Sequence, residues 1–181
     1  MTSAEHLADR ASEHTGLTDF GPDSWREGLE ILVRELQHSP SVTDSGREFT
    51  YGQYVDALSN RLRVIDYAKR HPEVSEENIE RPLVVLGMPR TGTTVANYLL
   101  DQDPERRSLL NWEAVDSIPP PTTATLRSDP RCVTKLDRQR ETLNALIAAG
   151  KGFPHWEDAD GPTECIFVQS QDFKALLWES T

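Results

Sequence analysis

The stretch RPLVVLGMPRTGTTVANYLL, residues 81–100, decides the predicted fold, because it runs from an apolar segment through a glycine-containing turn into a helical pattern. PLVVLG is short, rich in β-branched residues and free of charge, which is typical of a buried parallel strand. TGTTVANYLLDQ, which follows, is spaced like a helix. We therefore expect a strand, a turn and a helix in this order, and an α/β protein.

The turn between these two elements has the features of a binding loop for a tetrahedral oxyanion. Gly87 and Gly92 have the G-x-x-x-x-G spacing, permit unusual backbone angles and let a ligand approach the backbone closely. Backbone N–H groups converge at the start of the following helix, whose dipole adds partial positive charge. Arg90 supplies a permanently charged planar fork. Hydroxyl donors come from Thr91, Thr93 and Thr94.

The loop lacks the lysine of nucleotide triphosphatases. Thr93 stands directly after the second glycine, where that lysine would hold the β and γ phosphates. The missing lysine therefore argues against a kinase or triphosphatase, but this function stays an alternative. The structural alternative is a tight strand-to-helix turn with a surface arginine, although such a turn does not call for this many oxyanion donors.

The composition limits the class of protein. The chain has 181 residues, 36% of them hydrophobic, and a net charge of −11, which argues against nucleic acid or an anionic membrane surface as the general partner. The first residues lack the apolar core of a signal peptide, and no apolar run approaches the roughly 20 residues of a membrane span. Cys132 and Cys165 have no metal-type spacing. We expect a cytoplasmic protein, with no stable membrane insertion and no metal.

Helical patterns dominate the rest of the chain. Residues 1–80 are predicted to form a helical N-terminal region, with helices over 24–37, capped by Asp23 or Ser24, and over 49–71, capped by Thr50. Two further helices are expected over 132–150, with Gly150 as the stop, and over 163–181. Residues 103–131 are expected to be irregular. Since one strand cannot form a sheet, residues 81–181 are predicted to be the first part of a larger α/β domain.

Several stretches resemble a known family. LVVLGMPRTGTTVANYLLDQDP is similar to the 5′-phosphosulfate loop of sulfotransferases that use 3′-phosphoadenylyl sulfate, and most similar to the bacterial, especially actinobacterial, branch, whose PRTGTT loop tyrosylprotein sulfotransferases echo. The resemblance continues through LLNWEAVDSIPPP, DPR at 129–131 and HWEDADGPTEC, and covers roughly residues 71–181. It implies the P-loop-like three-layer sulfotransferase fold, truncated here, behind the helical N-terminal region.

The resemblance also implies roles for individual residues. Arg90 would contact the 5′-phosphate and the leaving bridging oxygen, and Glu113 would act as the catalytic base, with His155 as the alternative base. Glu164 would position its loop. The residues implied for donor binding are Gly87, Pro89, Arg90, Thr91, Gly92, Thr93 and Thr94. The family needs no metal for the transfer step.

The implied reaction is transfer of a sulfuryl group from 3′-phosphoadenylyl sulfate to an acceptor hydroxyl on a small molecule, a lipid or a sugar. The family's second motif, an arginine and a serine that bind the 3′-phosphate, is not found in the sequence. We therefore expect this chain alone to bind the donor poorly and to turn over little. Two alternatives remain open, a degenerate P-loop nucleotide kinase or triphosphatase and a non-catalytic remnant. No oligomeric state is predicted.

Overall fold

The computed structural model describes residues 2–88, 90–151, 157–175 and 178. The chain divides into two compact units, of which the first contains Met1–Glu77 together with Ile166–Thr181, and the second contains Asn78–Cys165. Each unit has its own hydrophobic core. The predicted division into 1–80 and 81–181 stays a prediction.

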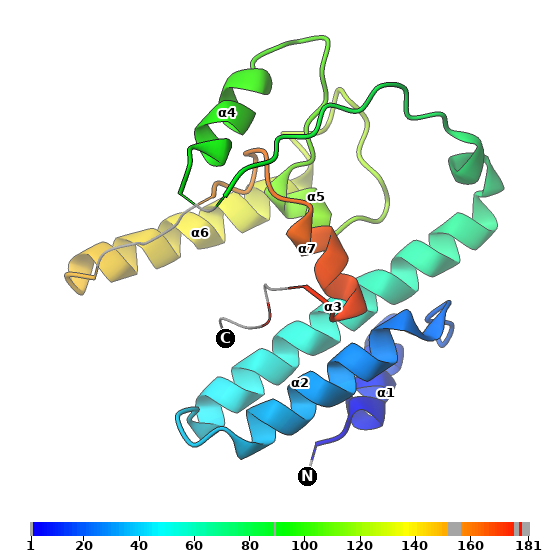
Figure 1. Ribbon diagram of the computed structural model, residues 1–181, viewed down its shortest axis with the longest axis vertical. Coiled ribbons are helices and arrows are strands. Elements are labelled where there is room, and N and C mark those ends of the chain that lie inside the picture. The colour runs from blue at the N-terminus through cyan, green and yellow to red at the C-terminus, as the bar shows by residue number, and fades with distance from the viewer. Residues whose placement is uncertain (1, 89, 152–156, 176–177, 179–181) are drawn as a thin grey trace. The chain divides into compact units, whose positions relative to one another are not determined.

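The first unit is built on three α-helices, α1 (Ala4–Thr15), α2 (Arg26–His38) and α3 (Asp44–Arg70), which Figure 1 shows in blue to cyan. The hydroxyl of Ser3 caps α1, and that of Thr43 caps α3 by accepting from the Gly46 N–H at 3.1 Å. Short 3₁₀ turns precede α2 (η1, Asp23–Trp25) and follow α3 (η2, Pro72–Glu76). The fully buried side chains of this core are Leu7, Trp25, Leu29, Tyr54, Val55, Leu58 and Leu62.

Residues 166–178 complete this first core. A short helix α7 (Ile166–Gln169) and the 3₁₀ turn η3 (Ser170–Asp172) lead to Phe173, which has a left-handed φ of 55°. The rings of Phe173 and Trp178 pack on Tyr54 with centroids 5.7 and 5.0 Å away. Gly28 makes room for the Phe173 carbonyl, which would lie 2.3 Å from a Cβ at position 28.

The second unit contains α4 (Thr93–Leu100), α5 (Asn111–Val115) and α6 (Pro130–Ala148). Asp129 caps α6 by accepting from the Arg131 N–H at 2.9 Å, and Pro130 occupies the first turn, where its missing N–H costs nothing. Gly150, with φ of 67°, follows the end of α6 and donates its N–H to Ile147 O at 3.0 Å. The core of this unit is formed by Leu110, Trp112, Leu126, Cys132 and Ala159.

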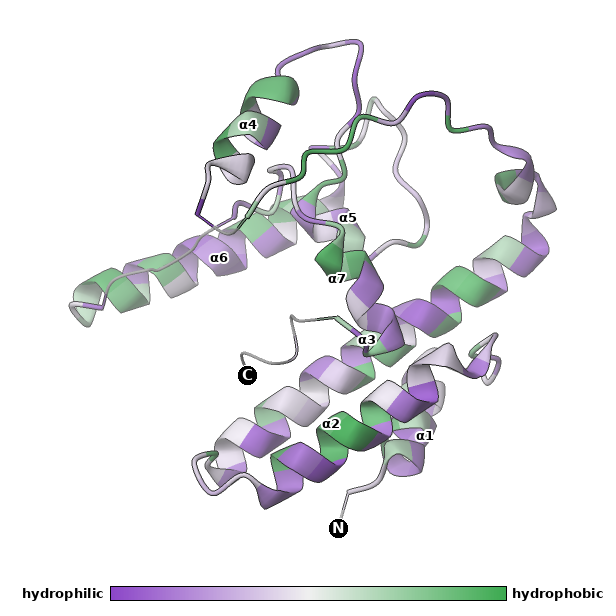
Figure 2. Ribbon diagram, viewed as in Figure 1, coloured by the Kyte–Doolittle hydropathy of each residue, from purple (hydrophilic) through white to green (hydrophobic). Residues whose placement is uncertain are grey.

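The predicted strand is not present as a strand. Residues 82–88 have no regular secondary structure, and the parts of the chain that the structure describes contain no β-strand, only an isolated bridge between Leu110 and Pro162. Figure 2 shows this segment as a green, hydrophobic trace, and Leu86 in it is 88% exposed. An apolar, β-branched sequence supplies the propensity for a strand but not the hydrogen-bonding partner, and a strand exists only when it is paired.

Three other predictions differ from the structure. The helix expected over 49–71 begins at Asp44, so that Thr43 and not Thr50 is the cap, because residues 44–48 continue the helix that the pattern placed later. Neither Asp23 nor Ser24 caps α2, since they form a 3₁₀ turn that runs directly into it. In the described part of the helix expected over 163–181, only α7 is α-helical, because packing of Phe173 into the core turns the chain away from a helical path.

The helices over residues 26–38, 93–100 and 130–148 confirm the sequence predictions to within a turn at each end. Helix α5 lies in the segment that we expected to be irregular. Across the described ranges, none of the helices combines the length and the apolar character needed to span a bilayer.

Candidate functional site

The predicted oxyanion loop forms an exposed bend that leads into α4. Gly92 has φ of 93° and is the N-cap of the helix, and Arg90 has φ of 68°, which is uncommon for a residue with a side chain. Gly87 is needed sterically, because a Cβ there would lie 2.7 Å from Thr93 Cγ2 and 2.8 Å from Thr91 Oγ1. Pro89 lies outside the described residues. The backbone of this bend therefore takes angles that depend on its glycines.

The start of α4 is open to a ligand. The first intrahelical bond runs from the Ala96 N–H to Gly92 O at 3.0 Å, and no side chain of the described chain caps the helix. Backbone N–H groups of the first turn, from Thr93 to Val95, therefore have no partner of the kind that a cap residue supplies. Arg90 is exposed and makes no ion pair with the residues that the structure describes. Thr91 is engaged, because its hydroxyl donates to Met88 O at 2.6 Å.

Helix α4 is anchored to the segment 157–163 at two points. The Tyr98 hydroxyl bonds to the Asp158 backbone and occupies the space beside Gly161, where a Cβ would lie 2.3 Å from it. Burial raises the pKa of Tyr98 above its usual value. Arg127 joins Asp101, at the end of α4, to the backbone of the same segment: its Nη2 lies 2.6 Å from Asp101 Oδ2, and its Nη1 donates to Asp160 O. The helix behind the loop is thus held in place.

Glu113, the predicted base, lies in the first turn of α5 and is 6% exposed. Its Oε1 accepts from the Leu110 N–H at 2.7 Å, which closes the N-terminus of the helix in the manner of a capping box. Its Oε2 accepts from Arg107 Nη2 at 2.6 Å. Both carboxylate oxygens are therefore engaged, one with the backbone and one with a side chain that is 45% exposed.

Helix α5 pairs with the segment 157–163, which is 46 residues further along the chain. The Asn111 N–H donates to Gly161 O at 3.0 Å, the Trp112 N–H donates to Ala159 O at 3.0 Å, and the Thr163 N–H donates to Leu109 O at 2.9 Å. The buried side chains of Asn111, Thr163 and Glu157 are hydrogen bonded to one another, with Thr163 Oγ1 2.5 Å from Glu157 Oε2. Two stretches that resemble the family are therefore parts of one packed substructure.

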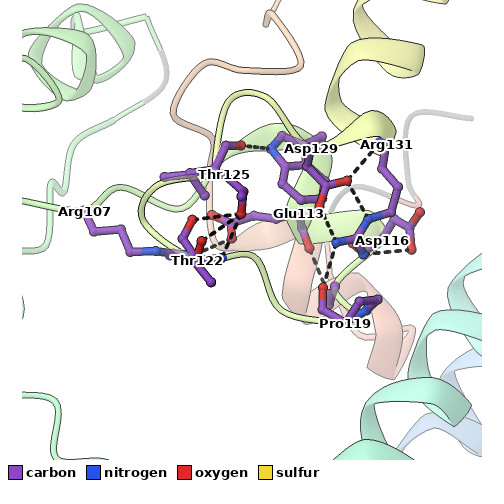
Figure 3. A network of polar contacts seen from close by, with 11 residues as sticks. Arg107, Glu113, Asp116, Pro119, Thr122, Thr125, Asp129 and Arg131 are labelled. Carbon is purple, nitrogen blue, oxygen red and sulfur yellow. Dashed lines mark hydrogen bonds and ion pairs between the residues drawn. The ribbon is translucent and has the colours of Figure 1, made fainter.

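Arg131 joins the start of α6 to the end of α5, as Figure 3 shows. Its guanidinium makes two 2.9 Å bonds to the Asp129 carboxylate and donates to Asp116 O at 3.1 Å and to Pro119 O at 2.7 Å. It also lies over the Trp112 ring, 4.8 Å from its centroid. The Asp129 carboxylate raises the pKa of Arg131, and Arg131 in turn lowers the pKa of Asp129.

Lys135 is a second contact between α6 and α5. Its Nζ donates to Asn111 O at 3.0 Å. Burial lowers the pKa of Lys135 from 10.5 to about 8, because removing the ammonium from water disfavours its charged form. Desolvation likewise raises the pKa of Cys132, one turn earlier on the same helix.

The site residues predicted from the sequence therefore fall into three groups. Gly87 and Arg90–Thr94 form the exposed bend, and Glu113 lies in the core of the same unit. Its neighbour Trp112 is a buried core residue whose Nε1 donates to Leu126 O at 2.9 Å. Glu164 is exposed, and His155 lies outside the described residues. No cluster of three metal-ligating side chains occurs among the residues searched, which are the described ones.

Sequence reasoning missed the residues that hold Glu113 and its helix α5 in place: Arg107, Asn111, Arg131, Lys135 and Glu157. Their contacts are with groups outside the repeating pattern of their own segment, and such contacts leave no periodic signal. One available sign was the sequence Asp-Pro-Arg at 129–131, where Asp and Pro mark a helix start and place the arginine in its first turn.

Comparison with known proteins identifies the family. The model of the sulfotransferase family matches residues 82–181, which is more than half of the chain. The chain belongs to the sulfotransferase family. The matched region contains the bend, α4, α5 and α6. No curated protein matches the chain.

Two crystal structures of sulfotransferases are similar over 99% of this chain. STF9 from Mycobacterium avium is 53% identical, with a TM-score of 0.91. STF1 from Mycobacterium tuberculosis H37Rv is 29% identical, with a TM-score of 0.77. The match covers 46% of the STF9 chain and 49% of the STF1 chain, so this chain spans about half the length of these relatives. The described part of the chain therefore has the sulfotransferase fold over that half.

Proposed function

We propose that this chain carries the donor-binding loop and the acceptor-activating residue of a sulfotransferase that transfers a sulfuryl group from 3′-phosphoadenylyl sulfate to an acceptor hydroxyl. The observation that carries the proposal is the exposed bend Gly87–Thr94, which ends in an uncapped helix N-terminus beside an arginine without a carboxylate partner in the described residues. Membership of the sulfotransferase family supports it.

The bend fits the 5′ end of the donor. Oxyanions bind at helix N-termini because unpaired backbone N–H groups and the helix dipole both favour negative charge there. Thr93 and Thr94 are partly exposed at this end, and Arg90 adds a charged fork. Gly87, Thr91 and Gly92 shape the bend and carry no side-chain charge for the ligand, and Pro89, outside the described residues, stays part of the proposed donor-binding set. No metal is part of the proposal.

The donor supplies an activated sulfuryl group whose bond to the 5′-phosphate oxygen breaks as the acceptor oxygen bonds to sulfur. Glu113 takes the proton of the acceptor hydroxyl, and His155 is the alternative base. Arg90 and the loop amides stabilise the charge that develops on the leaving phosphate of adenosine 3′,5′-bisphosphate. Losing one such preorganised donor costs about 3 kcal/mol of transition-state stabilisation in comparable sites.

Glu113 can serve as a base only through Oε2. Its Oε1 is held by the Leu110 N–H inside the α5 cap, whereas Oε2 faces the half-exposed Arg107. An acceptor hydroxyl must therefore reach Oε2 alongside or in place of the Arg107 guanidinium. Arg107 would therefore lie between the Glu113 carboxylate and the bound acceptor.

We also propose that residues 82–87, which are irregular and unpaired in the described chain, become the predicted parallel strand of an α/β, three-layer arrangement when another strand pairs with them. The exposed apolar side chains of Leu83, Val84 and Leu86 support this, because such a surface is stable only when it is covered. The cytoplasmic location also remains a proposal.

An NMR titration of the ¹⁵N-labelled chain with adenosine 3′,5′-bisphosphate tests the proposed function. We expect saturable shifts at the amides of Arg90–Val95, with weak affinity. Shifts elsewhere, or none, would overturn the donor assignment. Magnesium-dependent hydrolysis of ATP by the purified chain would favour the kinase or triphosphatase reading instead.

A further inference from the structure

A cavity of about 440 Å³ lies in the second unit, between the segment that follows α4 and the turns that precede α6. This volume is within the range of about 300–1,000 Å³ that is usual for small-molecule sites. Its lining contains three arginines, Arg106, Arg107 and Arg127, against two aspartates, Asp101 and Asp103. Each of the three arginines is paired with a carboxylate: Arg106 with Asp103, Arg107 with Glu113 and Arg127 with Asp101.

The three arginines differ in how firmly they are held. Arg127 is structural, because it bonds to Asp101, whose side chain is 8% exposed, and to the Asp160 backbone. Arg106 has an exposed pair with Asp103 at 3.0 Å, three residues earlier. Exposed pairs of this kind contribute little to stability, so Arg106 can exchange Asp103 for another anion at little cost.

Arg107 links the cavity to the candidate base. Its guanidinium uses one nitrogen, Nη2, for Glu113. The remaining N–H donors of its fork make no hydrogen bond to the described chain and are available to a ligand in the cavity. A ligand bound to Arg107 is therefore adjacent to the carboxylate that Arg107 holds.

The rest of the lining is mixed. Ser108, Thr123 and Ser128 add hydroxyl groups, whereas Pro104, Ala124 and Leu126 add apolar surface. No aromatic side chain contributes to the described lining, so it offers no ring on which a phenol could stack.

We propose that this cavity binds the hydroxyl acceptor through an anionic group on it, held by Arg106 and Arg107, and that the acceptor is a polyhydroxylated small molecule carrying a carboxylate, phosphate or sulfate. The inference rests on the proposed function, because it assigns the cavity to the acceptor of that reaction. It names Arg106 as a specificity-determining residue that touches the acceptor and not the reacting atoms.

The test compares glucose with glucose 6-phosphate and glucuronate in NMR titrations of the ¹⁵N-labelled chain. We expect the two anionic sugars to shift signals of Arg106, Arg107, Ser108 and Thr123, with at least about tenfold higher affinity than glucose, since a charge-assisted hydrogen bond is stronger than a neutral one. Arg106→Gln should abolish most of this preference. Arg140→Gln, an exposed arginine on α6, is the matched control and should preserve it.

Three outcomes would overturn the inference: equal affinity for glucose and the anionic sugars, an Arg106→Gln variant with unchanged preference, or shifts confined to residues 87–95. Because Arg107→Gln also removes a partner of buried Glu113, Arg106→Gln is the deciding variant. Adenosine 3′,5′-bisphosphate is titrated in parallel. If adenosine 3′,5′-bisphosphate binds the bend while no anionic sugar binds the cavity, the inference fails and the proposed function stands. If the anionic sugars bind the cavity while adenosine 3′,5′-bisphosphate does not bind the bend, only the donor assignment is removed.

Discussion

Arg107 Nη2 donates to Glu113 Oε2 over 2.6 Å, while the other oxygen of the same carboxylate accepts from the N-terminal backbone of its own helix. The Glu113 carboxylate thus closes the N-terminus of α5 and also holds Arg107, which lines the cavity. Glu113→Gln separates the capping of α5 from the pairing with Arg107, because Gln keeps a carbonyl oxygen for the Leu110 N–H but loses the charge that pairs with Arg107.

Glu113→Ala is expected to lower the free energy of unfolding of the second unit by about 2 kcal/mol, because it leaves the Leu110 N–H and Arg107 without their buried acceptor. Glu113→Gln should lower it by about half as much. Hydrogen exchange at the Ala114 and Asp116 amides, which are bonded within α5, measures this stability. Glu141→Ala, on the exposed face of α6, is the control, and a loss no larger than its loss would contradict the capping role.

Arg131→Lys is expected to destabilise the second unit by about 2 kcal/mol. Lysine cannot reproduce the paired bonds to Asp129 together with those to Asp116 O and Pro119 O, because its ammonium lacks the planar fork. Urea unfolding monitored at α5 amides would measure the change. Arg140→Lys removes an exposed pair and should change stability by no more than about 0.5 kcal/mol. Equal effects of the two substitutions would show that Arg131 does not organise this region.

Lys135 is expected to make stability depend on pH in the alkaline range. Its pKa in the folded state, about 8, lies below its ordinary value of 10.5, so the native state holds fewer protons than the unfolded state between these values. The stability of the chain relative to Lys135→Met should therefore rise as pH increases from about 8 to 10.5, by up to about 3 kcal/mol. Urea unfolding across this window measures it. A stability difference between the chain and Lys135→Met that stays flat across this window would refute the assignment.

The sequence predicted what depends on local pattern. Helices α2, α4 and α6 follow from apolar spacing and from end signals such as Gly150, and the bend at Gly92 follows from a glycine before a helical segment. The environment of Glu113 could not be predicted in this way. Its partners are Arg107, which lies in a segment without periodicity, and a helix fixed by backbone bonds to residues 159–163.

The strand prediction also failed because local sequence pattern does not contain the tertiary contacts. PLVVLG has the composition of a buried strand, yet its pairing depends on residues that the local pattern does not contain, and Leu83, Val84 and Leu86 are exposed in the structure. Phe173 is a similar case, because a helical pattern continues through it while its ring packs on Tyr54 and draws the chain into a left-handed turn. Tertiary contacts, present at Phe173 and absent at PLVVLG, therefore determine the conformation of both segments.

The central claim is that Arg90 and the amides of the bend hold the 5′-phosphate end of the donor. It is tested most directly by the affinity of adenosine 3′,5′-bisphosphate for the unmodified chain, for Arg90→Ala and for Arg81→Ala, an exposed arginine in the same segment. We predict that Arg90→Ala weakens binding by about tenfold or more, in line with the loss of a charge-assisted bond, and that Arg81→Ala leaves it unchanged. Equal affinity of the unmodified chain and Arg90→Ala would contradict the claim.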